Sequence, residues 1–231
     1  MACQAEYPQP GWSEAKFGIL TREKAFPDYA ALHPGYSRLT RQAKQRHDSI
    51  IGPSPGARLR KRLSGSMDHF TTESLTAERL REGHLADLVA LHLDPEVSRY
   101  LGGVRSAEVT KTYLAVNMAH WDQHGFGLWA LRTRDGAFAG RAGIRHILVD
   151  GIDEIELAYT FKRSLWGQGL ASEIAIAITD IGLSQLALPS LIGLVFAENG
   201  ASRRVLEKSN YVLEKSTTHR GQDVVIYRIR R

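Results

Sequence analysis

The chain of 231 residues contains a single cysteine, Cys3. One thiol excludes an internal disulfide and a cysteine-based metal cluster. Because no secretory signal is visible among the first residues, we expect a cytoplasmic protein. No apolar run approaches the ~20 residues of a membrane-spanning helix, so no membrane partner is expected. We separately expect the protein to be a monomer or a homodimer.

Acidic residues are scarce only at the start of the chain. Residues 1–66 hold 11 Lys or Arg and 5 Asp or Glu, whereas residues 67–231 hold 19 and 20, so the net charges are +6 and −1. The second segment therefore gives no electrostatic support for nucleic-acid binding. Charge and scattered prolines predict a disordered basic extension over residues 1–66 and a folded domain over 67–231. The run Arg58–Arg62 could contact RNA or an acidic partner, and Met67 could be the natural start.

The most informative segment reads as a strand, a glycine turn and a helix. The apolar run Ile155–Phe161 carries one carboxylate, Glu156, and leads to the turn Trp166–Ala171 and a helical pattern from Ser172. Such a turn presents free backbone N–H groups to an anion, and the helix dipole favours negative charge there. The segment therefore predicts a cofactor that carries phosphate.

Two common phosphate motifs do not fit this segment. A Walker loop ends in Gly-Lys-Ser/Thr, but Leu170 and Ala171 follow Gly169. A dinucleotide-binding turn has a third glycine where this chain has Ser172, and it needs an acid about 20 residues further on. No Asp or Glu occurs over residues 181–197, where the dinucleotide-binding turn would need its acid. The sequence therefore favours neither a Walker loop nor a dinucleotide-binding turn.

Hydrophobic periodicity and turn residues predict the remaining elements. The expected strands are 72–80, 127–132, 137–146, 155–161, 191–196, 211–215 and 224–229. The expected helices are 83–93, a short one from Pro95, one capped by Ser106 that runs to about Gln123, 170–186 and 201–209.

A second segment points to one family. The predicted strand Leu191–Phe196 is followed by Asn199, Ser202 and a helical pattern. Together with the glycine turn, it resembles the GNAT superfamily of acyl-CoA-dependent N-acetyltransferases. The turn is similar to that family's Q/R-x-x-G-x-G/A pyrophosphate loop, with Trp166, Gly169 and Ala171 at the fixed positions, and the second segment is similar to its Asn-x-x-Ser/Ala motif. Residues 93–101 and 125–129 look like the RimJ/RimL-type branch, and the resemblance covers about residues 72–231.

The resemblance implies a fold, a co-substrate and an activity. The fold should be α/β, a GNAT-type mixed twisted sheet of about seven strands with helices on both faces. Acetyl-CoA should give its acetyl group directly to a primary amine, either a protein N-terminus or a small molecule. The cofactor-binding residues implied are Tyr159, Thr160, Phe161, Trp166, Gly167, Gln168, Gly169, Leu170, Ala171, Ser172, Asn199 and Ser202.

Glu156 is the expected general base, because family members often place a carboxylate in the strand before the phosphate loop. An ion-paired strand carboxylate is the alternative for this residue, and Glu154 is the fallback base.

Many family members have a tyrosine that acts as general acid at the position where this chain has Leu206. Ser202 is therefore the expected substitute for this acid, with Tyr211 and Tyr159 as weaker candidates. We expect Asn199, Ser202 and Leu206 to share a helix face turned to the cofactor.

His120 and His124 lie at i and i+4, a spacing that can bind zinc, but Trp121 stands where the zincin pattern has Glu. We expect no metal site and assign these histidines to packing or to the acceptor mouth. Loops over 102–106, 120–127 and 147–154 should set acceptor specificity.

Two other function classes stay open. One is an acyl-CoA-binding sensor that has lost turnover, which Leu206 favours. The other is a ribosome- or RNA-associated protein that uses the basic segment of residues 1–66.

Overall fold

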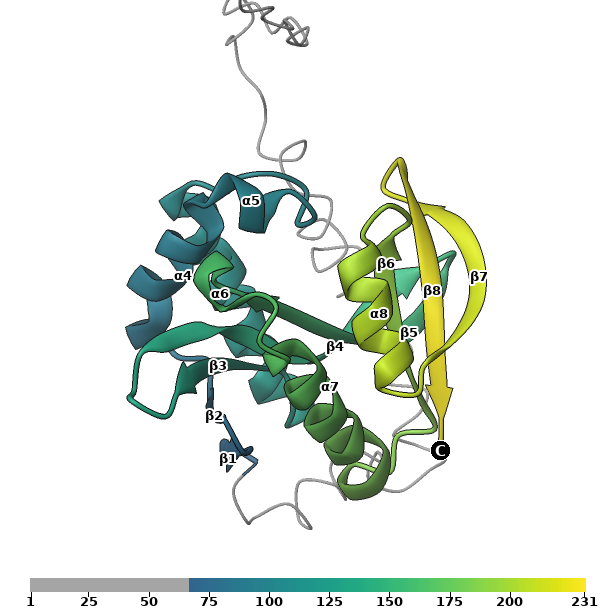
Figure 1. The fold of residues 1–231 in the computed structure, drawn as a ribbon, viewed down its shortest axis with the longest axis horizontal. Helices are drawn as coiled ribbons and strands as arrows, with labels where there is room; N and C mark the ends of the chain where they lie inside the picture. The colour runs from purple at the N-terminus through teal and green to yellow at the C-terminus, as the bar shows by residue number, and fades with distance from the viewer. Residues whose placement is uncertain (1–66) are drawn as a thin grey trace, which may run out of the picture. The chain divides into compact units, whose positions relative to one another are not determined.

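A computed structural model describes residues 67–231, and the predictions made for residues 1–66 lie outside this range. The described chain forms one mixed sheet of 8 strands in the order β1-β2-β3-β4-β5-β6-β8-β7, with helices on both faces (Figure 1). This is the mixed α/β sheet with helices on both faces that the resemblance implied, with one strand more than expected. Each helix within residues 67–231 is too short or too polar to span a lipid bilayer.

The first strands and helices build one side of the domain. The strands β1 (His69–Thr71) and β2 (Leu75–Arg79) form an antiparallel pair at the sheet edge. The Asp94 carboxylate caps the short helix that Pro95 begins, and the Ser106 hydroxyl caps the long helix as expected. The helices are α4 (Leu85–Leu93), α5 (Pro95–Ser98) and α6 (Ala107–His124).

The centre of the sheet is an antiparallel meander. It consists of β3 (Leu128–Thr133), β4 (Phe138–Val149) and β5 (Ile152–Phe161), which pair in sequence. Gly136 turns the first hairpin with a φ of 85°, and Gly151 turns the second with a φ of 78°. These left-handed conformations are ones that glycine adopts without steric cost.

After β5 the chain crosses to the second half of the sheet. The elements are α7 (Leu170–Asp180), a π-helical turn (Ile181–Gln185), β6 (Ser190–Phe196), α8 (Gly200–Lys208), β7 (Val212–His219) and β8 (Gln222–Arg230). Asn210 ends α8 with a φ of 65°, the left-handed conformation expected of an asparagine at this position.

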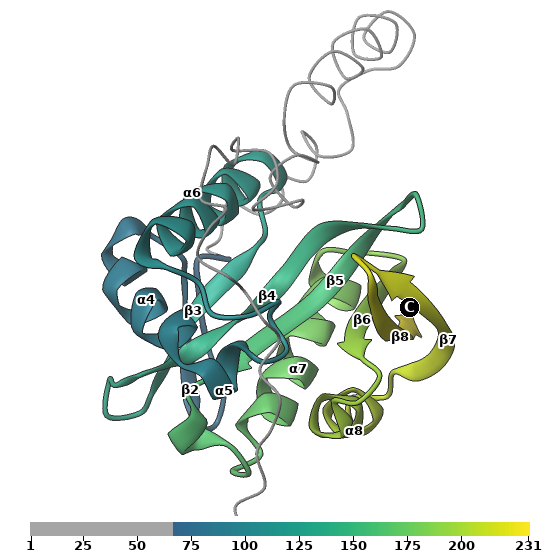
Figure 2. The same ribbon diagram turned by 90° about the horizontal axis from the view of Figure 1, so that it is seen from above.

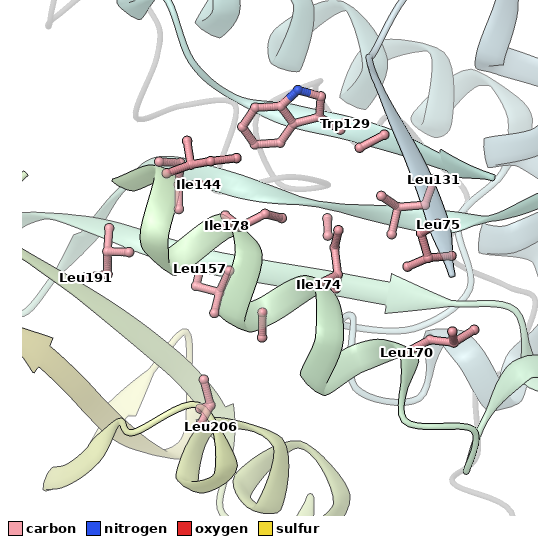
Figure 3. Close-up of a cluster of buried hydrophobic side chains, with 14 of the residues drawn as sticks. Leu75, Trp129, Leu131, Ile144, Leu157, Leu170, Ile174, Ile178, Leu191 and Leu206 are labelled. Carbon is pink, nitrogen blue, oxygen red and sulfur yellow. The ribbon is translucent and has the colours of Figure 1, made fainter. Parts of the chain in front are cut away.

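Two apolar cores sit on opposite faces of the sheet. Figure 2 shows α4 and α6 on one side of the central strands and α7 on the other. Beneath α7 and α8, Ile174, Ile178 and Leu206 pack on Leu157 and Leu191 of the strands (Figure 3). A second core joins α4 and α6 to β3 and β4. Apolar burial on both faces fixes the sheet between the helix layers.

Several sequence-based boundaries were wrong. The first predicted strand, 72–80, is shorter and forms only β2, because residues 72–74 are a turn that folds the unpredicted strand β1 back onto it. Two of the three predicted loops are mostly regular structure: residues 120–124 finish α6, and residues 147–149 and 152–154 lengthen the β4–β5 hairpin. Cross-strand pairing and packing of the helix on the sheet extend these elements beyond their predicted ends.

Gly143 is a position where the backbones of β3 and β4 approach too closely for a side chain. A Cβ atom there would lie 2.2 Å from Gly127 O and 2.6 Å from Leu128 Cα. Gly143→Ala should therefore lower the free energy of unfolding by roughly 1–3 kcal/mol, as measured by urea denaturation. Gly83→Ala is the matched control, because a Cβ at Gly83 meets nothing within 4 Å. Equal stabilities for the two variants would contradict the close approach.

Candidate active site

Strands β5 and β6 are parallel neighbours that share one registered pair, Glu156 with Ile192. Beyond this pair, β5 continues to Phe161 with β4 as its partner, while β6 pairs with β8 on its other side. Within the described chain, the edge of β5 that faces β6 over residues 157–161 therefore has no registered strand partner. The sheet forks at Glu156, and an extended ligand could pair with this edge as an added strand would.

The turn after β5 presents consecutive backbone amides. Gly167 and Gly169 have φ values of 78° and 83°, and Gly169 is the N-cap of α7. The N–H groups of Ser172 and Glu173 donate to Gly169 O, but those of residues 167–171 donate to no acceptor within residues 67–231. Added Cβ atoms at both glycines would meet nothing within 4 Å. Free amides at the N-terminus of an 11-residue helix suit the phosphates of a coenzyme A moiety.

Side chains of the turn hold its shape. The indole Nε1 of Trp166 donates to Phe161 O at 3.0 Å, and Nε2 of Gln168 donates to Ser164 O at 3.2 Å. Trp166, which replaces the usual Gln or Arg of the loop, therefore ties the turn to the end of β5. The same bond engages the Phe161 carbonyl, one of the groups predicted to bind the cofactor.

Glu156 is buried at the fork, with 7 % of its surface exposed. Its Oε2 accepts a hydrogen bond from Arg145 Nε at 3.0 Å across the β4–β5 ladder. The other carboxylate oxygen accepts no hydrogen bond from residues 67–231. Arg145 therefore orients the carboxylate through one oxygen and leaves the other oxygen without a donor in this part of the chain.

Glu154, the fallback base, is held elsewhere. Its two oxygens bind Arg228 of β8 at 2.7 and 2.9 Å. Arg228 also binds Glu214 of β7, and these bonds raise the pKa of its guanidinium. Glu154 is thus part of an ion-pair network that links β5 to the last two strands.

Asn199 and Ser202 meet β5 from the start of α8. The Asn199 Oδ1 accepts from Ser202 N at 3.1 Å and caps the helix. The Ser202 Oγ lies 2.8 Å from Tyr159 Oη. Burial raises the pKa of Tyr159 to about 12, against the opposing effect of its bond to Ser202. These two hydroxyls form a connected pair between β5 and α8.

Leu206 does not share that position, although the helical spacing predicted it. It is 1 % exposed and belongs to the core beneath α8 (Figure 3), and its methyl groups fill the space above Gly193. Tyr211 is also buried, and its hydroxyl lies 2.9 Å from Thr179 Oγ1. Burial raises the pKa of the Tyr211 phenol, so it is unsuited to give up a proton.

Sequence reasoning missed a group of arginines on the α4–α6 face of the sheet. Arg141, Arg145, Glu156 and Thr160 share this face, because Arg141 pairs with Thr160 and Arg145 with Glu156 in the ladder. Arg105, just before α6, approaches from the helix layer. The signal in the sequence was a pair of arginines four residues apart in a mostly apolar strand. Buried strands rarely carry such charges unless the charges have partners.

The structure adds a third histidine to His120 and His124. Nitrogen atoms of these two residues and of His146 on β4 lie within 4.8 Å of one another. His120 Nδ1 is bonded to Phe126 O, and its Nε2 accepts the His146 N–H at 3.1 Å. A metal ion bound by all three rings would have to displace the His146 amide, so the geometry favours His120 as a cap for the edge of β4.

The geometry is accompanied by a family match: residues 74–212 fit the model of the acetyltransferase (GNAT) domain. This chain belongs to the GNAT acetyltransferase family. The family uses acetyl-CoA and acts on amines, and the fork and the free amides of the turn are compatible with that co-substrate.

The chain is also similar to individual proteins and solved structures. The uncharacterized protein YkkB of Bacillus subtilis is 30 % identical over 135 residues, which are 58 % of this chain and 78 % of YkkB. The crystal structure of an Agrobacterium tumefaciens acetyltransferase has a TM-score of 0.64 and 26 % identity, and the match covers 73 % of this chain and 98 % of that one. The ribosomal L7/L12 α-N-protein acetyltransferase RimL, solved with coenzyme A, has a TM-score of 0.58 at 19 % identity over 69 % and 95 % of the chains, and shares the fold.

The buried His120 should make stability depend on pH. Burial lowers its pKa to about 3, helped by the charges of His124, His146 and Arg145 and opposed by the bond to Phe126. In the unfolded chain the His120 ring binds a proton near pH 6.5, whereas in the native state it stays neutral down to a much lower pH. The free energy of unfolding should therefore fall as the pH falls below about 6.5.

His120→Asn should weaken this dependence. Between pH 7.5 and 5.0 the variant should lose about 2 kcal/mol less unfolding free energy than the parent, since each such group contributes about 1.4 kcal/mol per pH unit. Urea denaturation at the two pH values measures the difference. His69→Gln, at an exposed position of β1, is the control. An unchanged difference in His120→Asn would show that this ring is protonated in the native state.

Proposed function

We propose that this protein transfers an acetyl group from acetyl-CoA directly to a primary amine, with Glu156 as the general base. The observation that carries the proposal is a buried carboxylate at the fork of β5 and β6, with one oxygen bound by Arg145 and the other accepting no hydrogen bond within residues 67–231. The single cysteine, Cys3, lies far from these residues in sequence, and within residues 67–231 no Ser or Thr hydroxyl at the fork is bonded to a histidine, which favours direct transfer.

The turn and the fork together would hold acetyl-CoA. The amides of residues 167–171 and the dipole of α7 would bind the pyrophosphate. The unpaired edge of β5 at Tyr159 and Thr160 would pair with the pantetheine arm, and an N–H there would polarise the thioester carbonyl. Asn199 would contact the same arm from the start of α8.

Acetyl-CoA supplies an activated acetyl group, and the residues of this chain would move the protons. Glu156 would take a proton from the amine nitrogen as the nitrogen bonds to the carbonyl carbon. The carbon–sulfur bond would then break, and the thiolate would receive a proton. Ser202 Oγ is the proposed donor, and its bond to Tyr159 Oη connects it to a second hydroxyl. This pair would serve where other family members have a tyrosine and this chain has Leu206.

A RimJ/RimL-type acceptor, a protein N-terminus, is one form of this function. RimL shares the fold, and residues 93–101 and 125–129 look like that branch. Small-molecule amines are the other form. A panel of both kinds with acetyl-CoA, followed by release of free thiol, tests the activity. Binding of acetyl-CoA without turnover of any amine would favour the sensor class instead.

Glu156→Gln keeps the shape of the side chain but removes its ability to accept a proton. Turnover of an accepted amine should fall about 10²–10⁴-fold at neutral pH, the usual scale of acid–base catalysis. The loss should shrink at high pH, where more of the amine is already neutral. Thiol release measured from pH 7 to 10 would show both effects.

Acetyl-CoA affinity provides the control for this variant. Glu156→Gln should bind acetyl-CoA as the parent does, because the phosphates and the pantetheine are held by other groups. Turnover equal to that of the parent would assign Glu156 to the Arg145 ion pair alone and leave water as the base.

Gly169→Val should abolish or greatly weaken acetyl-CoA binding measured by calorimetry. A branched side chain at a φ of 83° strains the turn and stands where the pyrophosphate would approach the amides. Gly151→Val is the matched control, since Gly151 has a φ of 78° and open space around it in the β4–β5 turn. If both variants bind acetyl-CoA equally well, the phosphates bind elsewhere.

A further inference from the structure

The arginine cluster on the α4–α6 face carries more positive charge than its partners balance. Arg105, Arg141 and Arg145 interact electrostatically with one another. Within residues 67–231, the one ion pair that these arginines make is that of Arg145 with Glu156. Arg141 is 3 % exposed. Burial lowers its pKa to about 10, and the charges of Arg105 and Arg145 act in the same direction. Uncompensated buried charge of this kind is costly unless an anion joins it.

The polar atoms of the cluster support the same conclusion. Arg141 Nε, Arg105 Nη1, Tyr113 Oη and Thr160 Oγ1 are buried and have no hydrogen-bond partner in the described part of the chain. Each of the four can donate a hydrogen bond. Native proteins rarely leave such groups unpaired, and four together imply a missing acceptor.

These atoms belong to one place. The guanidinium groups of Arg105 and Arg141 lie 5.1 and 5.0 Å from the same ring, that of Tyr113. Arg141 faces Thr160 across the ladder, on the same side of the sheet as Glu156. The donors therefore line β5 just beyond the fork, on the face that carries the proposed base.

We propose that Arg105, Arg141, Tyr113 and Thr160 form a binding site for a carboxylate of the acceptor, so that the acceptor is a small amine that carries a carboxylate. This inference rests on the proposed function and narrows its substrate class. Two guanidinium groups and two hydroxyls match a planar oxyanion, and arginine binds carboxylates in a bidentate manner. Glu156 and Thr160 are four residues apart, roughly 13 Å along the strand, so the arginine side chains and the ligand must bridge the distance from carboxylate to amine.

A series of acceptor amines of increasing length tests the proposal. Glycine, β-alanine, 4-aminobutanoate and 6-aminohexanoate are compared with alkylamines of matching length. At least one amino acid should exceed its alkylamine by about 10²-fold or more in kcat/KM, because a site built for a polar group rejects an analogue that lacks it. Equal use of both series would overturn the proposal while leaving the acetyltransferase function intact. Acetylation of peptide N-termini alone would overturn the assignment to a small acceptor.

Variants locate the site. Arg141→Met and Tyr113→Phe should reduce the ratio of kcat/KM between each preferred amino acid and its alkylamine, whereas Lys111→Met, which removes an exposed charge from α6, should leave the ratio unchanged. Without acceptor, Arg141→Met should melt at the same or a higher temperature, since it removes an uncompensated buried charge. A lower melting temperature with an unchanged ratio would make Arg141 a structural residue and overturn the proposal.

Calorimetry separates this inference from the proposed function. 4-Aminobutanoate and 6-aminohexanoate are titrated into the full chain with coenzyme A present, and acetyl-CoA is titrated separately. Binding of an amino acid that is lost in Arg141→Met supports the site even if no amine is acetylated. Loss of acetyl-CoA binding in the same variant would instead assign the arginines to the coenzyme and overturn the proposal.

Discussion

The structure depends on the parting of two parallel strands. β5 and β6 are in register only at Glu156 and Ile192, and each then follows a different partner. β4 and β5 stay between the α4–α6 layer and α7, whereas β6 stays with β8 and β7 (Figure 2). Backbone groups that cannot pair across the fork must find another partner, and an extended ligand is one that fits.

The fork also determines where the other parts of the site lie. The glycine turn connects the end of β5 to the N-terminus of α7, and the hydrogen bond from Trp166 to Phe161 O holds this turn against the end of β5. The end of β6 delivers Asn199 and Ser202 to the other side of the fork, where Ser202 meets Tyr159 of β5. Groups from three separate elements therefore converge because each begins or ends at the same strand pair.

The two faces of the fork differ chemically. The α7 face is closed by apolar packing, which includes Leu206, so the position that suggested loss of catalysis is explained by the core (Figure 3). Within residues 67–231, the α4–α6 face instead holds the buried Arg141 next to the half-buried Arg105 and Arg145, of which Arg145 is paired with Glu156. Burial strengthens electrostatic interactions, so charge on this face can select an acceptor more sharply than a solvated patch could.

Sequence by itself determined the family and much of the fold. The glycine turn, the Asn199–Ser202 motif, the Ser106 cap and the left-handed Asn210 follow from local rules of spacing and backbone conformation, which read directly from neighbouring residues. Pairing across the sheet was decided only by the tertiary structure. Strand pairing folded 69–79 into two strands and gave Glu156 its partner Arg145, whereas packing of the helix layers on the sheet placed Leu206 in the core and brought Arg105 to Arg141. These contacts join residues far apart in the chain, and strand register and burial, which set them, are properties of the whole sheet.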